Sequence, residues 1–418
     1  MGKISLKISP DTLTTFVAEF LVLISGLIVY KLAAAKFGQE GFSEYSLCRR
    51  TVSFIQPIMM LGLGVGLVRY IAINYSRPAE SDKYFIGGSF VLFVFSTFII
   101  LVLLLFRHNF AFLFFGNERY YYFMMPICMM LFGLMLHSIS YSYLRGKLKI
   151  TFANILQVIN MCIVPLAVFY WSDSLIHLLY FNGLLWVSVS FLSFIYIFRF
   201  VKFDKHHHYK PELKEMMRYS IPRVPGDIGY AAYFIFPAII TTHVVGIKEA
   251  GFVAFGITIL NMVTGFFSPI SLILLPKTSY WIANKEFNLL EDNVKKISLI
   301  AVLLTIAGTL FFFAFGDKII ELYLGPNYEE LIKNTKLILF GSIFFALFIC
   351  LRSVIDAYFV TARNSKNILI SLVVFLGLST LLFIFPINYF YINIFFVIGL
   401  FVLCVLTVLD ILIVFRNK

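Results

Sequence analysis

Long apolar runs alternate with short polar segments along the whole chain. Most runs are close to the roughly 20 residues that a helix needs to cross a hydrocarbon core about 30 Å thick. We predict twelve membrane-spanning helices, near residues 12–35, 44–73, 85–106, 121–144, 151–171, 175–199, 219–245, 251–283, 294–315, 334–360, 367–386 and 389–415. The pattern therefore predicts an all-α polytopic membrane protein.

The composition agrees with this fold class. Of the 418 residues, 60% are apolar and only 13% are charged, whereas about a quarter of a soluble domain is charged. This excludes an ordinary soluble domain, a secreted disulfide scaffold and a nucleic-acid-binding module, although the formal net charge is +12. The first apolar run resembles a signal peptide, but it is long and contains Glu19 and Lys31, so we expect a retained helix.

No motif for a cofactor or a catalytic centre stands in a credible context, so we predict no cofactor and no enzymatic activity. The five cysteines lie singly in or beside apolar runs, without a CxxC pair. Neither a disulfide nor a metal site is therefore indicated. The run His206-His207-His208 lies in a charged loop without a partner Cys/His motif, and we interpret it as a solvated loop.

Basic residues fix the predicted orientation. With the N-terminus in the cytoplasm, the cytoplasmic segments contain 20 Lys and Arg and the opposite face contains seven. Cytoplasmic loops of membrane proteins carry such an excess, so we expect both termini inside. The most basic link, residues 201–218, would join an N-terminal six-helix lobe, residues 1–200, to a C-terminal six-helix lobe, residues 219–418.

The two halves contain similar segments. The turn FGQEGFSEY (Phe37–Tyr45) after the first predicted span matches VGIKEAGFVAF (Val245–Phe255) after the seventh, and Gly41-Phe42 then aligns with Gly251-Phe252. Six helices return the chain to the face where it started, so such a repeat has parallel topology. The duplication predicts two lobes around a central cavity.

Cations inside the predicted spans are the main candidates for function. An Arg, Lys or Asp at a helix centre costs roughly 2.5–3.5 kcal/mol in the bilayer, so such residues are expected to face a wet cavity. Lys31, Arg49 and Arg50 gather at the outer end of the first two spans, against the general charge bias, which favours a cavity role. Arg69, Arg223 and Lys277 either face the cavity or reach lipid headgroups from the hydrocarbon edge.

Acidic residues offer a second group of candidates. Arg352 and Asp356 lie four apart, on one face of a helix, where an ion pair would offset part of the cost of burial. The pair would either clamp two helices or form a mobile gate. Glu19 and Asp227 lie at similar depths in the two halves and could exchange protons or only bond within the bundle.

Proline and glycine are frequent in three of the predicted spans. These residues remove backbone donors or permit close packing, so they predict helices that bend. They are Pro57, Gly62, Gly64 and Gly66 in span two, Pro222, Pro225, Gly226 and Gly229 in span seven, and Pro269 and Pro276 in span eight.

Taken with these turns and with YLRGKLKITFANILQ (Tyr143–Gln157), the chain resembles the polysaccharide-transporter branch of the multidrug/oligosaccharidyl-lipid/polysaccharide exporters, most closely O-antigen flippases of the Wzx type. The resemblance covers nearly all of the sequence. It implies a flippase of the bacterial inner membrane that moves an undecaprenyl-diphosphate-linked oligosaccharide between leaflets, with the lipid bilayer and the polysaccharide polymerase machinery as further partners and no nucleic acid. Cations that line the cavity of related flippases correspond here to Lys31, Arg49, Arg50 and Lys277.

Two other functions remain as alternatives. A cation-coupled multidrug exporter shares the expected fold, but its cavity would be acidic and aromatic. An O-antigen polymerase or ligase would need a large outward loop with catalytic basic residues, and the outward loops here are short. Both alternatives fit the sequence less well than a flippase.

Overall fold

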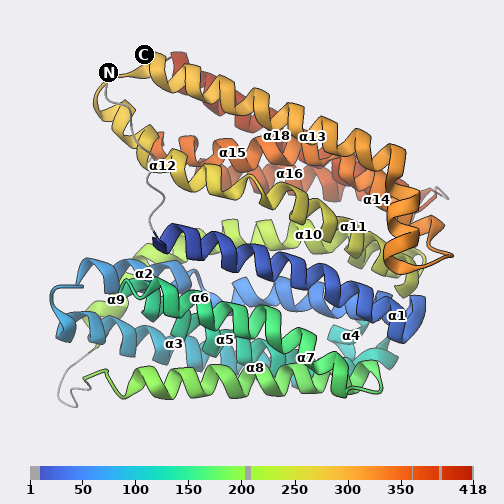
Figure 1. The fold of residues 1–418 in the computed structure, drawn as a ribbon, viewed down its shortest axis with the longest axis horizontal. Helices are drawn as coiled ribbons and strands as arrows, with labels where there is room; N and C mark the ends of the chain where they lie inside the picture. The colour runs from blue at the N-terminus through green and yellow to red at the C-terminus, as the bar shows by residue number, and fades with distance from the viewer. Residues whose placement is uncertain (1–9, 203–208, 360, 386–387, 417–418) are drawn as a thin grey trace. The chain divides into compact units, whose positions relative to one another are not determined.

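The computed structural model describes residues 10–202, 209–359, 361–385 and 388–416. Within these ranges the regular structure is helical and contains no β-strand (Figure 1). The run His206-His207-His208 falls outside them, so its interpretation as a solvated loop stays a prediction.

The helices account for the twelve predicted spans. In the described chain ten helices are long and apolar enough to cross a membrane, or eleven when the bent pair α14–α15 is counted as one span. Helix α1, Pro10–Met60, contains 51 residues and would be about 76 Å long as a straight helix, more than twice the thickness of a bilayer core. It is broken at Gly38 (φ 66°), so α1 supplies two spans.

The first half continues with helices joined by short turns. They are α2 Leu63–Ile73, α3 Pro78–Leu105, α4 Arg107–Phe115, the 3₁₀ helix η1 Glu118–Phe123, α5 Met124–Gly146, α6 Ile150–Val158, the π-helix η2 Ile159–Ile163, α7 Val164–Trp171 and α8 Leu175–Phe198. The predicted bend of span two lies between α1 and α2, where Leu61 (φ 48°) and Gly62 (φ 67°) both adopt left-handed backbone. Glycine reaches this conformation without a steric penalty.

The second half contains the remaining elements. They are α9 Lys210–Ser220, the 3₁₀ helix η3 Ile221–Arg223, α10 Val224–Val244, α11 Ile247–Gly265, α12 Ser268–Ala283, α13 Phe287–Leu324, α14 Glu329–Phe340, α15 Ser342–Tyr358, α16 Arg363–Ser379, α17 Leu381–Ile384 and α18 Tyr391–Arg416. Predicted span eight is interrupted between α11 and α12, and span ten bends by 43° between α14 and α15. The predicted link 201–218 is partly helical, because α9 occupies most of its second half.

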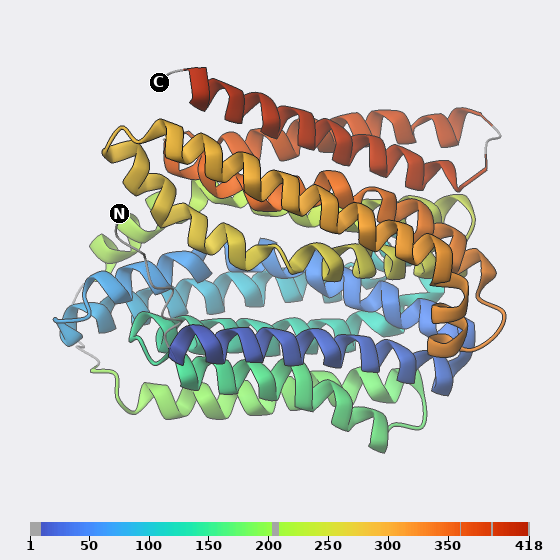
Figure 2. The same ribbon diagram turned by 45° about the horizontal axis from the view of Figure 1, so that its top comes forward.

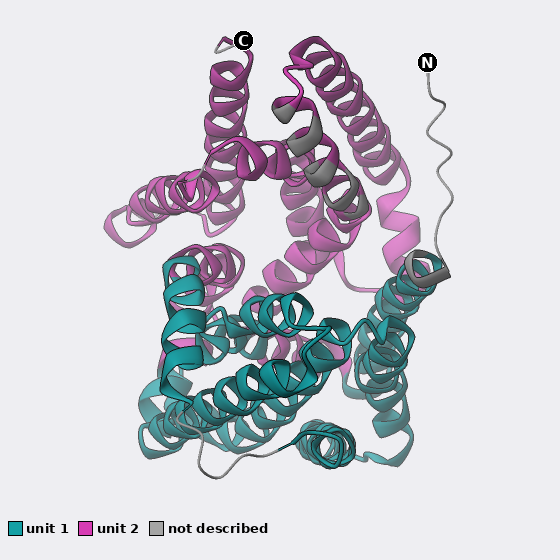
Figure 3. Cartoon of the chain, turned by 90° about the vertical axis from the view of Figure 1, so that its left-hand side faces the viewer, with its two compact units in different colours: residues 1–37, 51–112, 117–224 teal, residues 38–50, 113–116, 225–418 magenta. Residues whose placement is uncertain are grey.

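The chain divides into two compact units (Figure 3). Unit 1 contains Met1–Phe37, Thr51–Phe112 and Asn117–Val224, and unit 2 contains Gly38–Arg50, Leu113–Gly116 and Pro225–Lys418. Within unit 1, residues 10–37 and 51–60 of α1 run in opposite directions (Figure 2). The lobes 1–200 and 219–418 remain our proposal for the parts that move.

Contacts between the two similar turns explain why Gly38–Arg50 belongs to unit 2. The Ser43 hydroxyl donates to the Lys248 carbonyl at 2.9 Å, and a Cβ atom added to Gly251 would lie only 2.2 Å from the Ser43 Cβ. The two aligned phenylalanines, Phe42 and Phe252, both contact the Tyr328 ring, at 5.9 and 6.2 Å between centroids. Burial raises the pKa of Tyr328 above its usual value. The aligned turns thus pack against each other.

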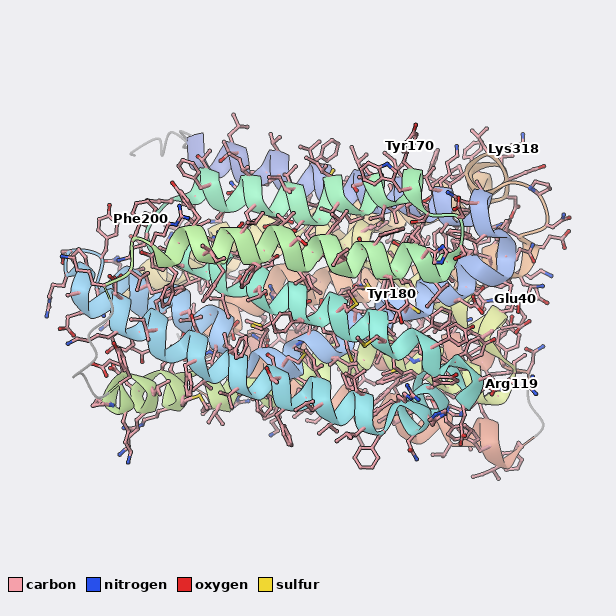
Figure 4. All side chains as sticks on the ribbon, turned by 90° about the horizontal axis from the view of Figure 1, so that it is seen from below. Glu40, Arg119, Tyr170, Tyr180, Phe200 and Lys318 are labelled. Atoms are coloured by element: carbon pink, nitrogen blue, oxygen red, sulfur yellow. The ribbon has the colours of Figure 1, made fainter. Side chains whose placement is uncertain are left out.

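A buried carboxylate connects several elements at one end of unit 1. Phe200 lies at one end of the unit, and Arg119 and Tyr170 lie at the other (Figure 4). At the Phe200 end the buried Asp82 carboxylate, in the first turns of α3, accepts from Lys147 Nζ and from the Lys202 backbone N–H, both at 3.1 Å. This carboxylate therefore ties α3 to the α5–α6 turn and to the segment after α8.

Candidate functional site

We call the parts of α1 before and after Gly38 its first and second arms. Arg50 lies in the second arm and is hydrogen-bonded to α11 of the same unit. Its Nη2 donates to Thr258 Oγ1 at 2.7 Å, and its Nε donates to the Ala254 carbonyl at 3.3 Å. These two acceptors are four residues apart, on one face of α11, where a glycine and alanines allow a neighbouring backbone to approach closely. The half-buried guanidinium is thus fixed along one edge.

Arg49 is held by its own helix. Its Nη1 donates to the hydroxyl of Tyr45, one turn earlier, at 3.2 Å, and the guanidinium lies 5.9 Å from the centroid of the Tyr45 ring. Side chains four apart in a helix are neighbours. Arg49 is half-buried and Tyr45 is buried.

A third arginine joins this region from α15. Arg352 and Arg50 both lie within electrostatic range of the Tyr230 hydroxyl on α10, and the Tyr230 ring is 6.2 Å from the ring of Phe345 on α15. Tyr230 thus connects Arg50, predicted to bind substrate, with Arg352, predicted to act in gating. Sequence analysis did not foresee this association because it depends on how α1, α10 and α15 pack. Arg49 precedes Arg50 in the same helix, and we call Arg49, Arg50 and Arg352 the arginine cluster.

The chemistry of the arginine cluster suits phosphate groups. A guanidinium stays charged at all accessible pH values and presents paired donors that match phosphate oxygens. Positive charges inside apolar helices are costly without an anion or a polar partner. Thr258 and Tyr230, which sequence analysis did not single out, supply polar groups beside the cluster.

The two predicted lysines lie elsewhere. Lys31 is exposed on the first arm of α1 and belongs to unit 1, whereas Lys277 is half-buried on α12 in unit 2. Among the side chains that the structure describes, no hydrogen bond or ion pair joins Lys277 to the arginine cluster. Their participation in substrate binding stays a prediction.

An asparagine connects the positions of the predicted pair Arg352 and Asp356. Asn364, buried at the start of α16, donates its Nδ2 to the Arg352 carbonyl at 2.8 Å and to Asp356 Oδ1 at 2.7 Å. Asp356 is exposed and Arg352 is half-buried. The contact of Asn364 holds the end of α15 on α16, and the ion pair itself stays a prediction.

An ion pair that sequence analysis did not predict lies between α16 and α18. Arg363 Nη1 and Asp410 Oδ1 are 3.0 Å apart, and Asn367 donates its Nδ2 to Asp410 Oδ2 at 2.8 Å. Arg363 and Asn367 are four apart at the start of α16, so a polar face on this helix was the available signal.

The predicted coupling residue Glu19 faces a polar network in unit 1. It accepts from Gln157 Nε2 at 3.0 Å, and it lies with Arg145 in electrostatic range of the Tyr141 hydroxyl. The corresponding residue of the second half, Asp227, is exposed in the first turns of α10.

This network continues through residues that sequence analysis missed. The His137 ring stacks near Tyr141, with centroids 5.6 Å apart, and its Nδ1 is 3.0 Å from Asn160 Nδ2, which also donates to Ser190 Oγ at 3.1 Å. Asn160 lies in the π-helix η2. Single polar residues within apolar runs were the only sequence signal for these positions.

The comparison with protein families decides the family. The family described as "Polysaccharide biosynthesis protein" matches residues 9–280, which is more than half of the chain. The chain belongs to the polysaccharide biosynthesis protein family. The matched segment contains both similar turns, Arg49, Arg50 and Lys277, and it ends before Arg352. The comparison of this chain with curated proteins found no match.

Solved structures show the fold of this polysaccharide biosynthesis protein. It is similar to an inward-facing multidrug resistance MATE family transporter of the MOP superfamily (TM-score 0.74, 14% identity, covering 95% of this chain and 96% of the other). It is also similar to the lipid II flippase MurJ in an inward closed conformation (TM-score 0.76, 14% identity, 95% and 87%). A third similar structure is a MOP superfamily transporter from Pyrococcus furiosus described as having a binding pocket of reverse polarity (TM-score 0.61, 14%, 95% and 92%).

These likenesses establish the fold. The protein is an all-α polytopic membrane protein, as the sequence predicted, and it shares its fold with the MATE transporter and the lipid II flippase. Structures at 14% identity do not define the transported molecule.

Proposed function

We propose that this protein is a flippase for an undecaprenyl-diphosphate-linked oligosaccharide, an O-antigen or similar repeat unit, in the bacterial inner membrane. The arginine cluster of unit 2 carries this proposal. A diphosphate is the group that three half-buried guanidinium side chains within apolar helices suit best. Membership of the polysaccharide biosynthesis protein family and a fold shared with a lipid II flippase support it.

The physical problem of the reaction is the mixed character of the substrate. The sugar headgroup is too polar for hydrocarbon, and the polyprenyl tail is too apolar for water. The arginine cluster would bind the diphosphate while the tail stays in lipid, and a change of conformation would expose the headgroup to the other side. Lys31 and Lys277 are further candidates for contacts with the headgroup. No covalent bond forms or breaks.

Four residues are candidates for coupling or gating. Glu19, hydrogen-bonded to Gln157, and the exposed Asp227 are carboxylates that can take up a proton or a cation. Arg352 and Asp356 lie at the end of α15, where Asn364 connects this helix to α16. Because Arg352 also belongs to the arginine cluster, movement of α15 would alter the binding of the diphosphate.

We propose that both termini lie in the cytoplasm. At the Phe200 end of unit 1, Arg145 lies in the last turn of α5, Lys147 and Lys149 lie in the turn that follows, and Lys202 lies after α8. This excess is typical of the cytoplasmic side. The turn around Gly38 would then face the periplasm, where the polysaccharide polymerase machinery would receive the flipped product.

A cation-coupled multidrug exporter is the second candidate, and the likeness to the MATE transporter favours it. A site for organic cations requires acidic or aromatic groups. The arginine cluster would repel such compounds, so the flippase agrees better with the local charge.

The proposal is tested in a bacterial strain that lacks its own flippase and makes the lipid-linked repeat unit. Expression of the wild-type chain should restore polysaccharide on the cell surface, and Arg49→Glu/Arg50→Glu should abolish it while the protein stays in the membrane. Lys318→Glu, an exposed position on α13, is the matched control and should keep the wild-type amount. Full display from the double glutamate variant would overturn the role of the cluster.

A further inference from the structure

Two arginines that the sequence singled out, Arg69 and Arg223, lie close together at the Phe200 end of unit 1. Arg69 is in the last turns of α2, and Arg223 is in η3, directly after α9. Their guanidinium carbons lie 4.4 and 3.8 Å from the centroid of one ring, that of Tyr219. The two cations are therefore less than 9 Å apart, and both are exposed.

The backbone around this pair is closely packed. A Cβ atom at Gly62 would lie 2.8 Å from the Ser220 carbonyl oxygen, and one at Gly66 would lie 2.5 Å from the Ser220 hydroxyl. The end of α9 therefore rests directly on the start of α2, with no room for a side chain between them. Tyr219, next to Ser220, is thereby held near Arg69.

Further aromatic contacts fix the same region. Tyr70 stacks on Tyr84 of α3, with centroids 4.9 Å apart, and meets the Tyr219 ring edge-on at 6.0 Å. Tyr84 is two residues beyond Asp82, whose carboxylate accepts a hydrogen bond from the Lys202 backbone N–H. The pair thus lies at the end of the unit that we propose to be cytoplasmic.

The two arginines are not neutralised by a direct ion pair. Among the residues that the structure describes, no carboxylate forms an ion pair within 4 Å of Arg69 or Arg223. The acidic side chain in electrostatic range of the same Tyr70 hydroxyl, Glu215, instead accepts from the Tyr84 hydroxyl at 2.5 Å. A second carboxylate, Glu212, is in electrostatic range of the Tyr84 hydroxyl but is buried. The two guanidinium groups are exposed at the surface, and neither carboxylate pairs with them within 4 Å.

We propose that Arg69 and Arg223 form a binding site for lipid-borne phosphate at the cytoplasmic surface, where the diphosphate of the substrate first docks. This proposal rests on the proposed function. Two guanidinium groups held close together repel each other, and a phosphate between them would remove this repulsion while accepting bonds from both. Tyr219 acts as a positioning residue, because its ring keeps both cations in place through cation–π contacts.

The phosphate could come from the polyprenyl diphosphate or from an anionic phospholipid, and binding measurements distinguish them. The full-length protein in detergent would be titrated with undecaprenyl diphosphate and, separately, with phosphatidylglycerol, and bound lipid would be counted by native mass spectrometry. Competition by phosphatidylglycerol at equal concentration would assign the site to phospholipid, and its absence would assign the site to the diphosphate. Binding of the diphosphate that requires the arginines supports docking of the substrate, whereas a site taken by phosphatidylglycerol would overturn it.

Variants decide whether the arginines are required. Arg69→Gln and Arg223→Gln should each raise Kd about fivefold, the usual effect of one cation near an anionic lipid surface. Glu215→Gln should lower Kd because it removes the nearby negative charge. Arg77→Gln, an exposed arginine before α3, is the matched control. Arg69→Lys/Arg223→Lys should retain more binding than the double glutamine variant.

Unchanged affinity of the double glutamine variant for both lipids would overturn the site, leaving the pair to stabilise α9 alone. The melting temperature of each variant would separate loss of binding from loss of fold. Surface polysaccharide in the complemented strain tests the proposed function separately. If the wild-type chain fails to restore display, the flippase proposal fails, whereas the titration still decides whether these arginines bind lipid phosphate.

Discussion

Arg50 shows how a cation is made compatible with an apolar helix. Two of its nitrogen donors are bonded along α11, to Thr258 and to Ala254. The group therefore has a defined orientation before any ligand arrives. Such preorganisation strengthens binding, because less side-chain freedom is lost when the phosphate arrives.

Loss of the Thr258 hydroxyl should weaken transport without removing a charge. Thr258→Val removes one charge-assisted bond of Arg50, worth about 1 kcal/mol, so we expect the rate of surface polysaccharide appearance to fall about fivefold. Thr305→Val is the control, since the buried Thr305 hydroxyl donates to the Ala301 carbonyl within α13. Equal effects of the two variants would contradict a special role for the bond to Arg50.

Removal of Asp410 should destabilise the fold more than removal of an exposed carboxylate. Its side chain is 7% exposed and is bonded to Arg363 and to the buried Asn367 amide. Asp410→Ala therefore leaves these donors without this acceptor, at a cost of about 1–3 kcal/mol. Asp317 is paired with Lys336 at 2.8 Å but is 66% exposed. Asp317→Ala should therefore lower the free energy of unfolding by less than about 1 kcal/mol. Thermal unfolding of the two variants in detergent measures the difference, and equal shifts would contradict the role of burial.

At the scale of the elements, close contacts at glycine determine how helices meet. The most crowded example joins the two similar turns, where Gly251 faces the Ser43 backbone and side chain. The repeat was visible in the sequence. Its consequence, that one turn packs on the other, depends on the spatial meeting of α1 and α11.

Gly251→Ala should separate α11 from the second arm of α1. The added Cβ would lie 2.3 Å from the Ser43 Cα, so the backbones must move apart, which costs about 1–3 kcal/mol or more. Gly308→Ala on α13 is the control, because a Cβ there meets nothing within 4 Å and alanine favours a helix. The melting temperature should fall for the first variant alone, and an unchanged value would show that the turns are not tightly packed.

Hydropathy predicted the spans well because each helix must present about the same apolar length to the bilayer. It did not reveal that helical structure continues on both sides of Gly38 through the predicted turn, nor that α9 would form within the basic link. Both depend on tertiary packing. For the candidate site, Arg49 and Arg50 were found because cations at the outer end of the spans run against the charge bias. Tyr230 and Thr258 could not be found, because ordinary polar residues on other helices carry no such signal.

At the scale of the whole molecule, the proposed orientation decides which side of the membrane each site would face. The chain has a transporter fold, and the bias of basic residues indicates which end of it is cytoplasmic. The arginine cluster and the Arg69–Arg223 pair would then act at different stages of one passage across the membrane.

Labelling of single cysteines tests this orientation. In a variant without the native cysteines, a cysteine in place of Glu40, next to the Gly38 break, should react with a membrane-impermeant maleimide in intact spheroplasts. A cysteine in place of Lys285, exposed between α12 and α13, should react only after permeabilisation. The opposite pattern would reverse the orientation and place the Arg69–Arg223 pair outside.

The leaflet position of the lipid-linked repeat unit tests the central claim most directly. In spheroplasts of the complemented strain, with the polymerase removed so that product is not consumed, sugars in the outer leaflet can be oxidised by impermeant periodate and counted by mass spectrometry of the lipid extract. We predict oxidised undecaprenyl-diphosphate-linked oligosaccharide with the wild-type chain and almost none with Arg49→Glu/Arg50→Glu, although both strains contain the lipid. Equal oxidation in both strains, or none in either, would contradict the account.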